Sequence, residues 1–161
     1  MSQATTIETT RYLHRWGGAK AYCDSLRKDI AEWHRIIEDA YSLEAQSIAA
    51  ISKTSTPSNP TARKAERCLR ITEQYKRYIA GKERQLKSEL RFLTVMDEVI
   101  NELPTNEREV ICLYYRDMRG DTWSAVARVL HNSQSNTEKL AGFAIKRISK
   151  RIEIEIKLDS F

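Results

Sequence analysis

The chain has 161 residues, of which 41% are hydrophobic and 30% are charged, with only 5 glycines and 3 prolines. This length suits one domain or two small ones, and the composition is typical of a helical protein. No stretch approaches the roughly 20 consecutive apolar residues that a membrane-spanning helix needs, and the polar first ten residues lack the features of a signal peptide. We therefore expect a cytoplasmic protein that does not enter a membrane.

The net charge of +5 comes from 27 basic and 22 acidic residues, and it is distributed unevenly. A net charge this small permits DNA binding but does not argue for it. The most basic segment is residues 61–91, with 10 basic and 4 acidic side chains and a net charge of +6. A solvated helix face is the more ordinary explanation of that segment, and a second surface for DNA phosphates is the alternative.

The N-terminal third predicts one long helix after a short start. The first ten residues are expected to fray, with Thr9 or Thr10 capping the first helical turn after them. Gly17-Gly18 should interrupt the helix, because glycine in a helix interior costs on the order of 1 kcal/mol. Apolar residues then recur at steps of three or four over residues 19–51. The segment 52–61, with two prolines and many small polar residues, predicts a loop.

A second long helical pattern runs from Ala62 to Leu103, with apolar residues at nearly heptad spacing and Gly81 as a candidate bend. Two helices of this length, joined by a short loop, predict a long antiparallel hairpin. Such a pair cannot easily bury all its apolar side chains alone. We therefore expect residues 1–103 to be an oligomerisation region that forms a homodimer or a higher homo-oligomer.

Residues 104–161 predict three shorter helical segments. Pro104 discourages continuation of the preceding helix, and Asn106 with Glu109 is a capping-type start for a helix over 107–115. Arg119-Gly120-Asp121 predicts a turn. Trp123, Val126, Ala127 and Leu130 then give one buried face of a second helix over 123–130.

The third segment comes after a polar break, His131-Asn132-Ser133. Either Ser133 or Ser135 can cap it, and Ser135 with Glu138 forms a candidate capping box. Leu140, Ala144 and Ile148 should face inward. Beyond Ile152 the sequence alternates apolar and charged residues, which leaves open an extension of the helix or a tail strand.

These residues carry a family resemblance. Leu103-Pro104, Glu107-Arg108-Glu109 and Tyr114-Tyr115 resemble the opening of a sigma-70 region 4-type helix-turn-helix. Its second and third helices are matched by Trp123, Val126, Ala127, Leu130, Ser133, Ser135, Leu140, Ala144, Lys146, Arg147 and Ile148. The whole chain resembles small phage late-transcription activators of the RinA/ArpU type. The turn departs from the pattern, with His131 for glycine, Asn132 for an apolar residue and Glu138 for a basic one, so no base preference carries over.

The helix order and the resemblance together predict an all-α fold, with residues 104–161 as a three-helix helix-turn-helix DNA-binding domain. The start of the third helix should face the base edges of the major groove. The candidate base contacts are Gln134, Ser135, Asn136, Glu138 and Lys139. The candidate phosphate contacts are Ser133, Lys146, Arg147, Lys150 and Arg151. Glu138 has a competing explanation as half of a capping box.

The resemblance implies a sequence-specific activator of phage late genes that binds double-stranded DNA and acts with host RNA polymerase in the bacterial cytoplasm. A dimer reading two half-sites would supply selectivity that one small module lacks. The alternatives are a small alternative sigma factor, or an adaptor that grips polymerase or a phage packaging protein without binding DNA. We expect no enzyme, cofactor or metal, because the sequence has no catalytic motif and its three cysteines are far apart.

Overall fold

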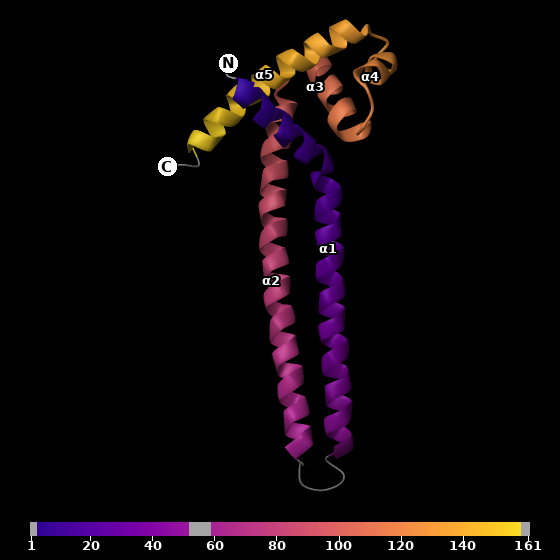
Figure 1. The fold of residues 1–161 in the computed structure, drawn as a ribbon, viewed down its shortest axis with the longest axis vertical. Helices are drawn as coiled ribbons and strands as arrows, with labels where there is room; N and C mark the ends of the chain where they lie inside the picture. The colour runs from indigo at the N-terminus through magenta and orange to yellow at the C-terminus, as the bar shows by residue number, and fades with distance from the viewer. Residues whose placement is uncertain (1–2, 52–58, 159–161) are drawn as a thin grey trace. The chain divides into compact units, whose positions relative to one another are not determined.

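The computed structural model of the protein describes the backbone of residues 3–51 and 59–158, and the side chains of residues 6–42, 66–67 and 69–152. The regular structure in those ranges is entirely helical, so the all-α prediction is confirmed. The elements are α1 (Gln3–Ile51), α2 (Asn59–Asn101), α3 (Thr105–Cys112), the π-helical turn η1 (Leu113–Asp117), α4 (Trp123–Val129) and α5 (Gln134–Leu158) (Figure 1). Among the described helices, none combines the length and the apolar character that a membrane crossing requires.

The chain divides into two compact units, and α1 and α2 contribute to both. Residues 1–22 and 89–161 form one of them, which we call the composite unit. Residues 23–88 form the other, which we call the two-helix unit. The boundary expected between Leu103 and Pro104 falls inside the composite unit, because the start of α1 and the end of α2 pack with the three C-terminal helices.

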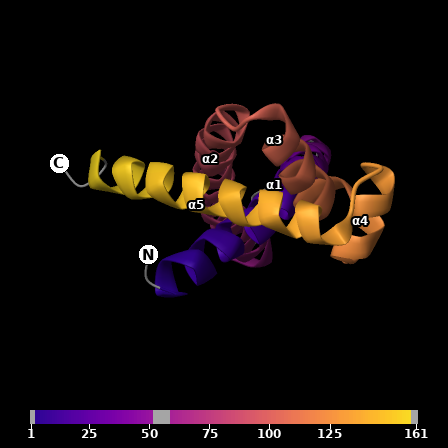
Figure 2. The ribbon, with the colours of Figure 1, turned by 90° about the horizontal axis from the view of Figure 1, so that it is seen from above.

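The core of the composite unit brings together residues that are far apart in the sequence. Leu13 from α1, Ile100 from α2, Ile111 from α3 and Ile148 from α5 are each at most 2% exposed. Figure 2 shows α5 crossing the N-terminal part of α1 and passing beside α3. The buried cluster comprises Leu13, Trp16, Met96, Val99, Ile100, Leu103, Ile111, Tyr115, Ala144 and Ile148. It is the shared core of α1, α2, α3, η1 and α5, and Trp123 of α4 packs against it.

In the two-helix unit, α1 and α2 run antiparallel and side by side (Figure 1). The ring of Trp33 on α1 contacts those of Tyr75 and Tyr78 on α2, at centroid distances of 4.9 and 5.2 Å. Lys82 on α2 pairs with Asp29 on α1 at 3.6 Å. Aromatic packing and one partly exposed ion pair therefore fix the register of the two helices.

The predicted interruption at Gly17-Gly18 is wrong, because α1 continues through both glycines. A Cβ built on Gly17 would lie 1.8 Å from the carbonyl oxygen of Tyr115 and 2.7 Å from its carbonyl carbon. Only glycine lets the two backbones approach this closely. The tertiary contact between α1 and η1 thus explains a residue that its local helix propensity disfavours.

The helix boundaries also differ from several predictions. Thr9 and Thr10 lie inside α1 rather than capping it, and the Thr10 hydroxyl donates to the carbonyl of Thr6 at 2.9 Å. The second helix begins at Asn59 and ends at Asn101. Of the predicted loop over 52–61, residues 52–58 lie outside the described residues. The segment after Ile152 is helical, so α5 reaches Leu158 and the alternative of a tail strand is wrong.

Two predicted capping arrangements are wrong. Pro104 is the residue before α3 and no side chain caps that helix, so Asn106 and Glu109 do not form a capping box. Proline suits this position because the residue before a helix is non-helical, here with φ −52° and ψ 144°, and its missing N–H is not needed by the helix. At α5 the cap is Ser133, which was one of the two predicted caps. The other prediction, a capping box of Ser135 with Glu138, is wrong because Ser135 lies within the helix.

Candidate nucleic-acid interface

The segment before α4 is set by a glycine turn and a threonine cap. Gly120 has a φ of +94°, which fulfils the predicted turn at Arg119–Asp121. Thr122 is the N-cap of α4, and its hydroxyl accepts a hydrogen bond from the backbone N–H of Ala125 at 3.3 Å. The Trp123 ring stacks on that of Tyr114, with centroids 3.6 Å apart and planes inclined by 6°. These contacts orient α4 on the segment that precedes it.

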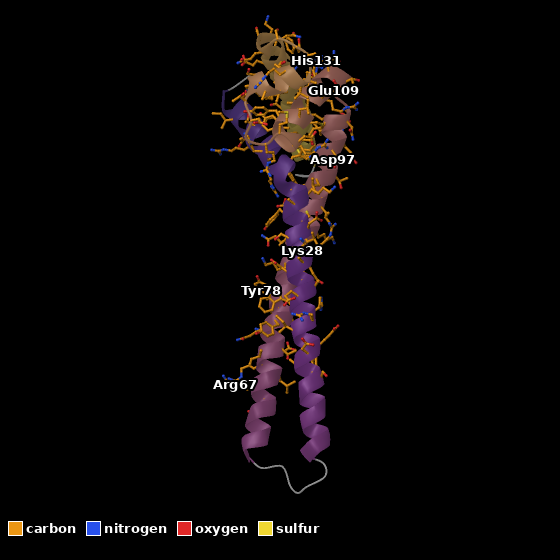
Figure 3. The ribbon with its side chains drawn as sticks, turned by 90° about the vertical axis from the view of Figure 1, so that its right-hand side faces the viewer. Lys28, Arg67, Tyr78, Asp97, Glu109 and His131 are labelled. Carbon is orange, nitrogen blue, oxygen red and sulfur yellow. The ribbon has the colours of Figure 1, made fainter. Side chains whose placement is uncertain are left out.

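The turn between α4 and α5 is tight and fully hydrogen-bonded at its start. The backbone N–H groups of Leu130, His131 and Asn132 donate to the carbonyls of Val126, Arg128 and Ala127. His131 has a φ of +50°, a left-handed conformation that side chains other than glycine resist. The histidine thus takes a backbone conformation that glycine adopts most readily. Figure 3 labels His131 in this turn.

The first turn of α5 is fixed by Ser133 and Thr137. The Ser133 hydroxyl accepts from the backbone N–H of Asn136 at 3.2 Å. The Ser133 carbonyl accepts from both the N–H and the hydroxyl of Thr137, each at 3.0 Å. Thr137 is completely buried, so its hydroxyl is satisfied inside the packed face of the helix. This clamp turns the residues on either side of Thr137 outward.

The five candidate base contacts all lie at this start of α5 and are exposed. Two of them are already engaged with each other, because the Gln134 amide donates to the Glu138 carboxylate at 2.8 Å. The Asn136 amide donates to the side chain of Asn132 at 3.0 Å. The side chains of Ser135 and Lys139 make no hydrogen bond or ion pair with any described residue. These two are therefore the side chains most available to a ligand.

The candidate phosphate contacts separate into two groups. Lys146 and Lys150 are exposed on α5. Arg147 pairs with the carboxylate of Glu107 on α3 at 3.2 Å, and Arg151 pairs with Glu102 at 3.1 Å. The Glu107 side chain is only 8% exposed, so loss of the Arg147 partner would leave a buried carboxylate uncompensated. These two ion pairs connect α5 to α3 and to the residue that follows α2. The remaining candidate, Ser133, uses its hydroxyl to cap α5.

Sequence reasoning missed two exposed apolar residues on this side of the molecule. Phe143 on α5 is 54% exposed and Val129 on α4 is 52% exposed. Phe143 follows Lys139 by four residues and precedes Lys146 by three, so the three side chains share one helix face. The exposure of Phe143 could have been predicted from this spacing, because the inward-facing Ala144 and Ile148 lie on a different face of the helix.

Beneath α4, the η1 segment supports the interface through buried tyrosine. The Tyr115 side chain packs edge-on against His14 at a centroid distance of 4.9 Å. Burial raises the pKa of Tyr115 to about 12, so the phenol stays neutral under physiological conditions. Burial likewise raises the pKa of the Cys112 thiol. Both groups serve packing rather than charge chemistry.

The described residues contain no group of three histidine, cysteine or acidic side chains placed to hold a metal ion. Comparisons of the chain with protein-family models, with curated proteins and with solved structures found no match.

Proposed function

We propose that the protein is a sequence-specific DNA-binding transcription activator, in which α3, α4 and α5 form a helix-turn-helix and α5 enters the major groove. The family resemblance of the sequence extends the proposal to phage late genes, with host RNA polymerase as the partner and the bacterial cytoplasm as the location. Within the proposal, α1 and α2 form the antiparallel hairpin through which two copies join.

The observation that carries the proposal is the construction of the start of α5. Ser133 and Thr137 fix the first turn, while Ser135 and Lys139 remain exposed and unengaged. A short helix, a tight turn and a longer helix whose first turns are exposed is the layout by which many proteins present side chains to base edges. Direct readout requires this combination of a rigid backbone and uncommitted side chains.

Each exposed group has a chemical role in this mechanism. Lys139 can donate to the O6 and N7 acceptors of guanine, and Asn136 or Gln134 can pair with adenine. Glu138 can accept from the cytosine amino group once Gln134 releases it. Phosphate contact falls first to Lys146 and Lys150, because Arg147 and Arg151 are held in ion pairs.

The test is a comparison of Lys139→Ala with Lys20→Ala, an exposed lysine on α1, in gel shifts on two duplexes. One duplex carries the sequence enriched by the wild-type protein from a random pool, and the other is a random sequence of equal length. Lys139→Ala should lose about 1–3 kcal/mol on the enriched sequence and little on the random one, while Lys20→Ala should match wild type on both.

An equal loss on both duplexes would remove the base-reading role of Lys139. Failure of the wild-type protein to enrich any sequence, or binding that does not weaken as salt is raised, would contradict the proposed function as a whole.

One observation favours a second function, that of an adaptor which binds protein through α4 and α5. Val129 and Phe143 place exposed apolar area where a DNA reader mostly needs polar groups. In that case purified RNA polymerase should bind the protein without DNA, and Phe143→Ser should weaken the complex. Lys20→Ala, at an exposed lysine of α1, should then leave binding unchanged.

A further inference from the structure

The second helix carries arginine at a constant interval of seven residues. Seven residues are close to two helical turns, so side chains at this spacing share one face. The series is Arg63, Arg70, Arg77, Arg84 and Arg91. Arg67, Gln74 and Gly81 fall on the same face at steps of three and four. We call the members with described side chains in the two-helix unit the arginine row; they are Arg67, Arg70, Arg77 and Arg84.

The arginine row lies on the side of α2 away from α1. All four members are exposed, whereas Thr72 and Ile79, on the opposite side of the helix, are 6% and 4% exposed. Figure 3 shows the labelled Arg67 pointing away from α1. From Arg67 to Arg84 the row is about 26 Å long, at 1.5 Å per helical residue. It is therefore a line of positive charge that contributes nothing to packing within its unit.

The arginines of α1 in the same unit behave differently. Arg27 pairs with Asp24 at 2.8 Å, and Arg35 pairs with Glu32 at 2.8 Å, so each is neutralised three residues away. By contrast, Arg67, Arg70 and Arg77 form no ion pair with any described residue.

The nearby acids and the last arginine of the row do not change this contrast. Glu66, next to Arg67, forms no ion pair with any described residue. Glu73 beside the row is paired with Lys76 at 3.6 Å. Arg84 donates only to the backbone carbonyl of Ala80, at 3.3 Å. The two helices therefore differ, because Arg27 and Arg35 of α1 are paired whereas three of the four arginines in the row are not.

Gly81 adds a second, independent observation. It lies between Arg77 and Arg84 on the same face, and a Cβ built there would meet nothing within 4 Å. Internal packing therefore gives no reason for a residue that costs a helix about 1 kcal/mol relative to alanine. Glycine on a surface lets an outside group approach the backbone closely. The row is thus open to a ligand between Arg77 and Arg84.

The chemistry of the row fits a phosphate backbone better than an acidic protein. Guanidinium groups bind phosphate and carboxylate with paired hydrogen bonds, so charge alone admits both. A protein interface also needs an apolar centre, whereas the positions beside the arginines are polar or glycine: Glu66, Glu73, Gln74, Gly81, Gln85 and Ser88. Protein–DNA interfaces are polar and strongly positive, and duplex DNA presents a negative charge about every 1.7 Å along its axis.

We propose that the arginine row is a second nucleic-acid surface, which binds the phosphates of duplex DNA without regard to sequence. It is separate from α5 and does not depend on the function proposed for that helix. In this role it supplies affinity, whereas α5 supplies selectivity.

The experiment measures binding of the full chain to a random duplex over a series of salt concentrations. The triple variant Arg67→Gln, Arg70→Gln, Arg77→Gln is compared with the triple variant Lys20→Gln, Lys28→Gln, Lys87→Gln. Both remove three exposed positive charges, but the second set lies off the row. Each lost phosphate contact lowers the slope of log affinity against log salt by about 0.9. The row variant should lose roughly 2 to 3 from the slope, and the control should keep the wild-type slope.

Equal slopes for the two triple variants would overturn the proposal, as would the absence of random-duplex binding by the wild-type chain at about 50 mM salt. The two functions fail separately. If the row binds DNA but α5 does not read bases, the row variant loses random-duplex binding and no sequence is enriched. If α5 reads bases but the row is inert, a sequence is enriched and the two triple variants match.

Discussion

The composite unit and the two-helix unit bury their apolar side chains by different means. The composite unit draws ten buried residues into one cluster from α1, α2, α3, η1 and α5. The two-helix unit has only two surfaces to bring together, so Tyr41, Leu69, Ile71 and Tyr78 stay between 38% and 55% exposed. Close, shape-specific packing is thus a property of the first unit, and open surface is a property of the second.

The comparison indicates where each unit tolerates change. A core assembled from several elements is sensitive to one added methyl group where backbones meet. A pair of helices tolerates most substitutions on its outer faces, and its exposed apolar residues are available to a second copy of the chain. Substitutions matched between the units can test this difference.

The largest effect is expected from Gly17→Ala in the composite unit. The added methyl group would overlap the Tyr115 carbonyl, which belongs to the backbone and cannot rotate away. We expect a loss of about 3 kcal/mol in the free energy of unfolding, measured by urea denaturation. Gly18→Ala is the control, because the three atoms nearest to its methyl group all belong to the guanidinium at the end of the Arg119 side chain, from 3.0 Å. Equal stability of the two variants would refute the close-approach explanation.

An intermediate effect is expected on association through the two-helix unit. We expect the wild-type chain to sediment as a dimer at micromolar concentration. Leu69→Glu should weaken the dimer by about 2 kcal/mol, because Leu69 is 55% exposed in the single chain and would be buried by a partner. Ile7→Glu, at a residue 56% exposed in the composite unit, should leave the dimer intact. A wild-type monomer would exclude this assembly.

The smallest effect is a gain in stability from Gly81→Ala. Nothing lies within 4 Å of the added methyl group, so the helix keeps its geometry while the unfolded chain loses freedom. Thermal unfolding should show an increase of about 0.5–1 kcal/mol. Gly142→Ala in α5 has the same open surroundings and should gain a similar amount. A loss at Gly81 alone would reveal a contact within the two-helix unit that the structure lacks.

Local patterns in the sequence predicted the helices and the turns between them. The period of three and four gave the long helices, Gly120 gave the turn before α4, and the spacing of Val126 and Ala127 gave the buried face of α4. These signals are local because backbone geometry and amphipathic spacing act over a few residues. The exposed candidate base contacts on α5 result from the same spacing.

Contacts between distant segments could not be predicted in this way. From the local sequence alone, Gly17 is expected to interrupt the helix, whereas its actual role is to allow close approach of the Tyr115 carbonyl. Arg147 and Arg151 read as free cations until Glu107 and Glu102 are placed next to them. Choosing Ser133 over Ser135 as the cap also required the backbone path of the turn. In each case the deciding partner or geometry is absent from the local pattern.

The π-helical turn at Leu113–Asp117 has a consequence for how the chain can vary in length. Its widened turn is closed by the N–H of Met118 on the carbonyl of Leu113 at 2.7 Å, five residues back instead of four. One residue is therefore accommodated here beyond what an ordinary α-turn would hold. Deleting a single residue from Leu113–Asp117 would remove the widened turn and let the helix end on ordinary four-residue hydrogen bonds. The path of the backbone from η1 into the turn before α4 therefore depends on that one additional residue.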